Sequence, residues 1–271
     1  MQLTERQIHF FETWGYLHFP SLLADRIPWI EEQYNLVWQE RGVNHTGEQR
    51  SCIVPFIDQR AEFCTLLDDP RLVGLTEGVL GPDFNYLGGD GNWYTGDTAW
   101  HSDGFHHVAR YLKVAIYLDP LTRDTGCLRV IPGTHRLGDA TKWEARQARN
   151  SLELWGIEQR DVPAMALETQ PGDVVAFNHN LMHSSFGGGK RRRMFTLNFC
   201  NHAEKPEEIT DLVGFINAQA RFWIDHLHSD AMRATASPQR MRFLRQVMEH
   251  EGELAGLAAK ARREMPESAR G

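Results

Sequence analysis

The first part of the chain carries hydrophobic residues at the spacing of α-helices. Ile8, Phe10 and Phe11 form an apolar stripe close to the N-terminus. Thr4, followed three positions later by Gln7, is the sequence of a capping box at the start of that helix. The same pattern predicts helices at 27–41, 62–67 and 71–80, with a short strand at 16–20. We therefore expect residues 1–83 to be mainly helical.

The pattern changes after Gly81. Short hydrophobic runs follow one another, separated by turn signals every ~8–12 residues, which is typical of a sandwich or barrel of short strands. Glycine- and proline-rich turns mark the breaks between them. The predicted strands are 85–87, 92–95, 112–118, 128–131, 164–168, 174–178 and 193–200. This part of the chain, residues 84–200, is predicted to form a β core.

Helical spacing returns near the C-terminus, where we predict helices at 207–228 and 238–263. The predicted fold class is thus mostly β with flanking helices (α+β), in a single domain over 1–271 with C-terminal helices in 201–271. The polar segment 138–160 resembles an insertion, and long loops of this kind often act as lids.

Composition narrows the function classes. The formal net charge is -7, which argues against a nucleic-acid partner. No run of ~18 apolar residues suggests a membrane span, and the N-terminus is not that of a signal peptide. The four cysteines form no C-x-x-C pair, so we expect no structural zinc site and a reducing, cytoplasmic location. The oligomeric state is not predicted by these features.

The segment His101-Ser102-Asp103 is the first candidate for chemistry. On a strand, residues two apart point to the same side about 6.6 Å from each other, so this imidazole and carboxylate can bind one metal ion. His183 is the candidate third ligand. Two histidines and one carboxylate are typical of non-haem iron(II) oxygenases. An H-x-D pair alone is weak evidence in a chain with 13 histidines, and a surface hydrogen bond is the simpler alternative.

Two arginines after His183 are candidates for binding the co-substrate. Arg192 lies nine positions after His183, where a guanidinium can bind a carboxylate of the co-substrate 2-oxoglutarate through two hydrogen bonds. Ser185 can add a hydroxyl to the same carboxylate. Arg193 is the alternative, and it points to the opposite face of a strand from Arg192.

Five segments in order make the chain similar to one family. They are 3–17, 100–104, 126–135, 171–177 and 192–195. With them the sequence resembles the phytanoyl-CoA dioxygenase family of iron(II)- and 2-oxoglutarate-dependent oxygenases. The resemblance implies a double-stranded β-helix (jelly-roll) core. It also implies Fe(II) on His101, Asp103 and His183, with 2-oxoglutarate held by Arg192.

The implied reaction uses dioxygen, releases succinate and carbon dioxide, and most often hydroxylates a small molecule. Related halogenases lack the carboxylate ligand, so Asp103 disfavours halogenation. Desaturation and ring formation on the same site remain alternatives, as does a metal-binding module without redox turnover. Two departures from the family pattern are Ser184, where a glycine is usual, and the short loop at 187–189.

Other residues are candidates by position. Asn92 and Tyr94 share one face of a predicted strand and can bind 2-oxoglutarate, with a core or surface role as the alternative. Lys113 faces away from the apolar side of its strand, toward either the active site or solvent, and can bind an acidic substrate or the co-substrate. Residues 215–223 are expected to pack against the core. The remaining candidates for substrate contact are Trp93, Phe105, His106 and His107.

Overall fold

The structure is a computed structural model that describes residues 1–136 and 147–270. The expected insertion at 138–160 therefore lies partly outside the described residues. Its remaining part holds a 3-10 turn at Gln147–Asn150 and the short helix α6 at Ser151–Trp155.

The centre of the molecule is a seven-stranded antiparallel sheet. Its strands follow the order β1-β9-β6-β11-β4-β2, and β3 also pairs with β11. The long strand β11 therefore has neighbours on both edges, and its side chains alternate between two buried faces. The strands are β1 Tyr16–Phe19, β2 Ser51–Ile53, β3 Phe84–Tyr86, β4 Gly91–Tyr94, β6 Tyr111–Tyr117, β9 Val174–Asn178 and β11 Arg192–Asn201.

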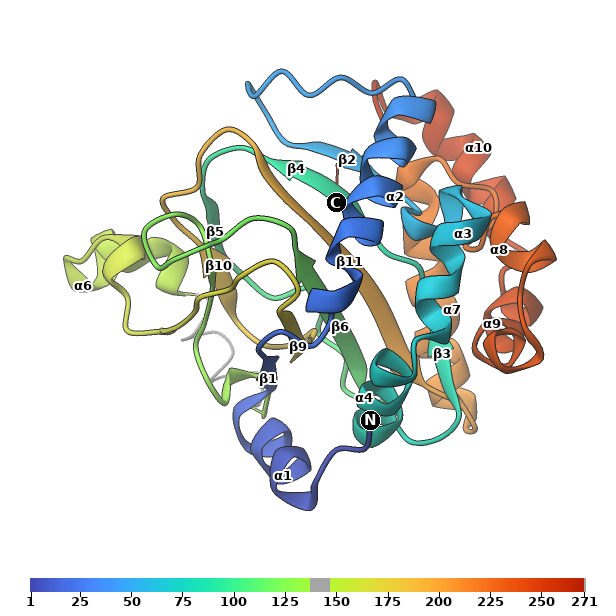
Figure 1. Cartoon of the computed structure of the whole chain (residues 1–271), viewed down its shortest axis with the longest axis horizontal. Coiled ribbons are helices and arrows are strands. Elements are labelled where there is room, and N and C mark those ends of the chain that lie inside the picture. Colours follow the sequence, from blue (N-terminus) through green and yellow to red (C-terminus); the bar gives the residue numbers. More distant parts are fainter. Residues whose placement is uncertain (137–146, 271) are drawn as a thin grey trace.

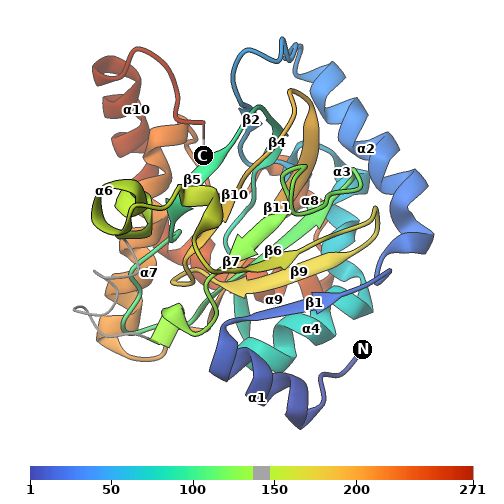
Figure 2. The ribbon, with the colours of Figure 1, turned by 90° about the vertical axis from the view of Figure 1, so that its left-hand side faces the viewer.

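A second, four-stranded antiparallel sheet has the order β5-β10-β7-β8. Figure 2 shows this smaller sheet and α6 on the opposite side of the large sheet from α2 and α4. Two facing antiparallel sheets with helices outside them confirm the predicted mostly-β core with flanking helices. The strands are β5 Thr98–His101, β7 Leu128–Val130, β8 Met165–Leu167 and β10 His183–Ser185.

Helices cover the outer face of the large sheet, and the C-terminal helices continue this layer (Figure 1). The predicted capping box of α1 is present, with Thr4 and Gln7 bonded to each other's backbone N–H groups. The other helices are α1 Glu5–Trp14, α2 Ile27–Glu40, α3 Ala61–Cys64, α4 Pro70–Leu80, α7 Pro206–Ala218, α8 Asp230–Ala234, α9 Pro238–His250 and α10 Leu254–Glu264.

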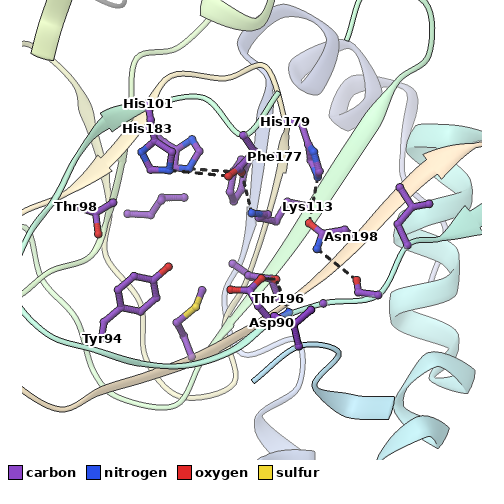
Figure 3. A pocket seen from close by; sticks show the side chains of 18 of the residues that line it. Asp90, Tyr94, Thr98, His101, Lys113, Phe177, His179, His183, Thr196 and Asn198 are labelled. Carbon is purple, nitrogen blue, oxygen red and sulfur yellow. Dashed lines mark hydrogen bonds and ion pairs between the residues drawn. The ribbon is translucent and has the colours of Figure 1, made fainter. Parts of the chain in front are cut away.

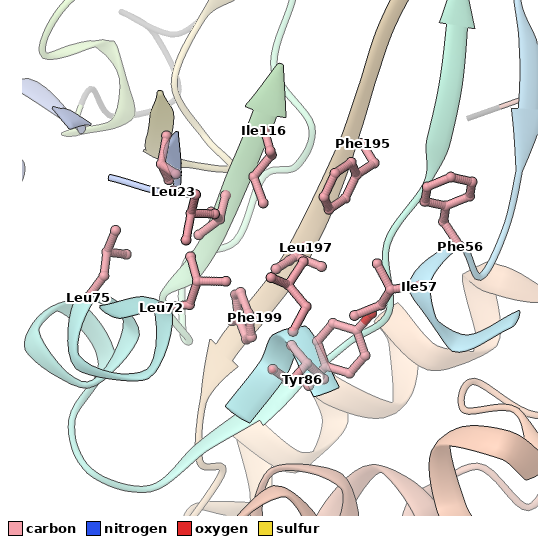
Figure 4. Packing of buried hydrophobic residues seen from close by; sticks show 14 of the residues in the cluster. Leu23, Phe56, Ile57, Leu72, Leu75, Tyr86, Ile116, Phe195, Leu197 and Phe199 are labelled. Atoms are coloured by element: carbon pink, nitrogen blue, oxygen red, sulfur yellow. The ribbon is translucent and has the colours of Figure 1, made fainter. Parts of the chain in front are cut away.

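The main hydrophobic core lies between these helices and the large sheet. Figure 4 shows Leu72 of α4 near Phe199 of β11, and Phe195 farther along β11 near Phe56, all within one buried cluster. Each such side chain contributes about 1.5–3 kcal/mol when it leaves water. This apolar face fixes the register of β11, so its opposite face is presented toward the small sheet.

The structure corrects some element boundaries. β2 in the N-terminal part joins the large sheet, although the sequence pattern does not predict it. The predicted helix 207–228 is wrong beyond Ala218, because a 3-10 turn follows and Trp223 adopts a left-handed conformation. The predicted helix 238–263 is likewise two helices, α9 and α10, which are separated at Glu251.

Candidate active site

Two adjacent strands of the small sheet bring the predicted metal ligands together. His101 ends β5 and His183 begins β10, and the two residues face each other in register. Asp103 follows β5, where its backbone N–H donates to the His179 carbonyl at 2.9 Å. One ligand atom each from His101, Asp103 and His183 lie within 4.8 Å of one another, so these residues can share one metal ion.

The hydrogen bonds of both histidines leave the correct nitrogen free for a metal. Nδ1 of His101 lies 2.8 Å from the Ala99 carbonyl, and Nδ1 of His183 lies 2.8 Å from the Leu181 carbonyl. Because a carbonyl oxygen only accepts, each Nδ1 carries the proton and each Nε2 keeps its lone pair. These Nε2 atoms lie 3.9 and 3.6 Å from the Asp103 carboxylate.

The protonation states of these residues also suit a bound metal ion. Burial lowers the pKa of His183 to about 3, so its imidazole is neutral. Burial alone would raise the pKa of Asp103, but the ammonium group of Lys113 holds it well below its usual range. Neutral imidazole and ionised carboxylate are the forms that bind a metal.

The three residues open into a cavity of about 300 Å³ between the two sheets (Figure 3). Alternate residues of two paired strands form one wall, which is the face of β11 that does not pack on the helices. The residues of this wall are Lys113, Ala115 and Tyr117 on β6 and Arg192, Met194, Thr196 and Asn198 on β11.

Arg192 lies at one end of this wall, and its side chain is buried. Its Nη1 donates to Ser185 Oγ at 2.6 Å and to the Gly126 carbonyl at 2.8 Å. The guanidinium lies 4.9 Å from the centre of the Tyr94 ring. It makes no ion pair with a carboxylate of the described residues, and burial lowers its pKa. A buried cation without an anionic partner is costly, so this end of the cavity suits an anionic ligand.

Arg193 differs from Arg192 in its orientation and in its ion pairs. It points to the other face of β11, where it pairs with Asp119 at 2.8 Å and with Glu31 at 2.9 Å. Its charge is therefore balanced within the protein. Of the two arginines considered from the sequence, only Arg192 lines the cavity.

Lys113 lies at the opposite end of the wall. Its Nζ is 2.9 Å from Asp103 Oδ2, and it is visible beside His179 and Asn198 in Figure 3. Nearby, Arg50 pairs with Asp90 at 2.9 Å. The alternation of β6 thus directs Lys113 into the cavity and away from solvent.

Five residues predicted as cofactor or substrate contacts do not line the cavity. Asn92 accepts a hydrogen bond from Arg50 at 2.8 Å and so supports the wall from behind. Trp93 points to the other face of β4, against Tyr34 of α2. Beyond the H-x-D segment, His106 stacks on Tyr111, whereas Phe105 and His107 are exposed outside the cavity. Phe105, His106 and His107 were candidates because they follow Asp103 closely in the sequence, and Asn92 and Trp93 because they lie on the strand before it.

Several cavity residues were not predicted. Strand alternation from Arg192 is a signal that would have found Thr196 and Asn198. No local signal marks Arg50 and Asp90, or the C-terminal residues that close one end. Phe215, Gln219 and Phe222 line the cavity, so segment 215–223 contributes to the site as well as packing against the core.

Comparisons with known proteins identify relatives. The family model described as phytanoyl-CoA dioxygenase (PhyH) matches residues 38–194. A Caenorhabditis elegans protein described as a probable phytanoyl-CoA dioxygenase is 31% identical over 109 residues, which are 38% of this chain and 32% of that protein. The match therefore spans about a third of that relative's length.

Solved structures share the fold. SnoK, a non-heme alpha ketoglutarate dependent carbocyclase from nogalamycin biosynthesis, is 19% identical with a TM-score of 0.58, covering 73% of this chain and 84% of its own. EctD from S. alaskensis with bound Fe is 22% identical with a TM-score of 0.56, covering 75% and 80%. EctD with 2-oxoglutarate and 5-hydroxyectoine is 20% identical with a TM-score of 0.55, covering 74% and 77%. The core of this chain is therefore the double-stranded β-helix predicted from the sequence.

Two further predictions concern the chain as a whole. All four cysteines are free thiols, and none is paired with another. None of the helices in 1–136 and 147–270 combines the length and apolar character needed to span a bilayer.

Proposed function

The chain belongs to the phytanoyl-CoA dioxygenase family, and we propose that it hydroxylates a small molecule with release of succinate and carbon dioxide. Iron(II) and 2-oxoglutarate are its cofactors. One observation carries the proposal: the cluster of His101, Asp103 and His183 opens into the same cavity as the buried guanidinium of Arg192, which has no carboxylate partner in the described part of the chain.

The donor set fits the cofactor. His101, Asp103 and His183 would hold iron(II) with two neutral nitrogens and one carboxylate, a set that leaves positions open for other ligands. When bound, iron(II) and 2-oxoglutarate supply the activation of dioxygen. The Nδ1 hydrogen bonds to the Ala99 and Leu181 carbonyls fix the orientation of the two imidazole rings before the metal binds. Less conformational entropy is therefore lost when the metal binds.

Arg192 would bind the distal carboxylate of 2-oxoglutarate. Ser185 Oγ lies 2.6 Å from the guanidinium and donates to the Gly126 carbonyl, so it positions the arginine and can also contact the carboxylate. Tyr94 covers one face of the same guanidinium. These neighbours exclude water around the pair, which strengthens the interaction between opposite charges.

The reaction outcome is proposed from the ligand set. A carboxylate at position 103 occupies the place that a halide would need, and this disfavours halogenation. Hydroxylation is the outcome that we propose. Desaturation and ring formation need the same residues, so they are distinguished by analysis of the product.

The proposal is tested with anaerobic protein, iron(II) and 2-oxoglutarate. We expect a weak visible charge-transfer band that requires both additions, and its loss in Asp103→Ala. Asp161→Ala is the matched control, because Asp161 is exposed and makes no ion pair among the described residues. A wild-type protein without this band would contradict the proposal, and so would catalysis that continues without oxygen.

A further inference from the structure

The strand register separates the cavity into two ends. Asn198 pairs with Lys113 across β6 and β11, whereas Arg192 is six residues away along β11. At ~3.3 Å per residue the backbone positions of Arg192 and Asn198 are ~20 Å apart. 2-Oxoglutarate that contacts both Arg192 and the metal ligands fills the cavity between them. The part of the cavity beyond Lys113, toward Leu87 and Phe215, is then available to another molecule.

The charge of the cavity is opposite to that of the chain. The protein carries a formal net charge of -7, yet four basic and only two acidic side chains line the cavity. Iron(II) and the 2-oxoglutarate dianion together add no net charge to this balance. A positive cavity in an acidic protein attracts anions from solution. The residues are Arg50, Lys113, Arg192 and Arg221 against Asp90 and Asp103.

Lys113 has hydrogen-bonding capacity that the protein does not use. Its ammonium group has three N–H donors, and it forms an ion pair with Asp103 Oδ2 at 2.9 Å. No second ion pair of Lys113 occurs among the described residues. Its side chain is 16% exposed, and the exposed part lies in the cavity. Buried donors need acceptors, and an incoming anion would supply them next to the metal ligands.

The residues around the Lys113 end of the cavity indicate what kind of anion can bind there. The part of the cavity between Lys113 and the C-terminal helices is lined mainly by apolar residues. Arg221 lies on the same side, is exposed, and has no acidic partner among the described residues. The apolar residues are Val54, Pro55, Leu87, Phe215, Phe222, Ile224 and Leu227.

From these observations we infer that the substrate is a small organic acid with an apolar body. Its carboxylate binds Lys113, its body lies against Phe215 and Leu227, and Arg221 attracts it to the entrance. The inference rests on the proposed function, because it assigns the occupant of the same active site. Lys113 is thereby a specificity-determining residue as well as the partner of Asp103.

The test is equilibrium binding to anaerobic protein that contains iron(II) and saturating 2-oxoglutarate. The probes are short aliphatic and aryl carboxylic acids, each paired with its uncharged primary amide, and binding is measured by calorimetry. We expect acids to bind at least about tenfold more tightly than their amides, since a hydrogen bond to a charged group is lost in the amide. Lys113→Met should remove this difference.

A second variant, at an exposed position, tests the inference even if Lys113→Met does not fold. Arg221→Gln, at an exposed position, should weaken acid binding at low salt and have less effect at high salt, because salt screens exposed charges. Arg245→Gln is the matched control on the exposed face of α9. Acids and amides that bind equally, or acids that fail to bind, would overturn the inference.

The two proposals fail in different ways. If Lys113→Met keeps both the charge-transfer band and the preference for acids, the inference is wrong and the proposed function stands. If Lys113→Met instead weakens binding of 2-oxoglutarate, Lys113 serves the co-substrate and the inference is also wrong. A missing band in the wild-type protein contradicts the proposed function directly.

Discussion

Two arginines that are adjacent in the sequence have different roles. Arg192 and Arg193 are neighbours in sequence, but strand alternation places them on opposite faces of β11. Arg193 has its carboxylate partners within the protein, whereas Arg192 has only neutral ones. The buried, unbalanced charge is the one that a ligand must neutralise. The partners of each side chain therefore indicate its role more clearly than residue type does.

Substitution of the two arginines should give opposite results. Arg192→Met removes charge-assisted hydrogen bonds worth about 1.5–3 kcal/mol, so the KM for 2-oxoglutarate should rise tenfold to about a hundredfold. Arg193→Met should leave this KM nearly unchanged and lower the free energy of unfolding instead. Steady-state kinetics and urea denaturation measure the two effects. A larger KM change in Arg193→Met would reverse the assignment.

At the scale of single helices and strands, the sequence predicts the elements that have a strong local pattern and misses those that depend on tertiary contacts. The central strands β6, β9 and β11 have strong local patterns, and the structure places them as expected, whereas β5 and β10, which carry His101 and His183, were not predicted as strands. The short strand β2 and the 3-10 turn at Gln219–Phe222 have no such pattern. They are held by contacts with β4 and with the C-terminal helices. The cavity residues Gln219 and Phe222 lie in this turn, and Arg50 directly precedes β2, so their placement depends on tertiary packing that no local spacing reveals.

The turn before β7 gives a prediction at this scale. Gly126 has φ +99°, and a Cβ there would lie 1.9 Å from Arg192 Nη1. Gly126→Ala should therefore displace the guanidinium and raise the KM for 2-oxoglutarate, with a cost in stability of about 1–3 kcal/mol. In α7, a Cβ on Gly214 would meet nothing within 4 Å. Gly214→Ala should stabilise that helix by up to about 1 kcal/mol without a change in KM. Equal KM values in the two variants would contradict the close contact.

At the scale of the whole molecule, the active site joins two sheets. His101 and His183 belong to the small sheet, and Arg192 belongs to the large one. A co-substrate that touches both the metal and Arg192 connects the sheets through a ligand. Binding energy at this position is then available only when both sheets are folded and correctly placed. The cofactors should stabilise the native state as a unit.

This coupling predicts how ligands change the free energy of unfolding. A ligand at one hundred times its Kd that binds only the folded protein adds about 2.7 kcal/mol, which anaerobic urea denaturation can measure. Iron(II) should stabilise the wild type and Arg192→Met alike, because Arg192 is not a metal ligand. 2-Oxoglutarate should stabilise the wild type only when iron(II) is present, and its effect should be much smaller in Arg192→Met. In Asp103→Ala both effects should fall. Full stabilisation by 2-oxoglutarate without iron(II) would mean that the residues around Arg192 bind it without the metal, and the joined site would then be the wrong description.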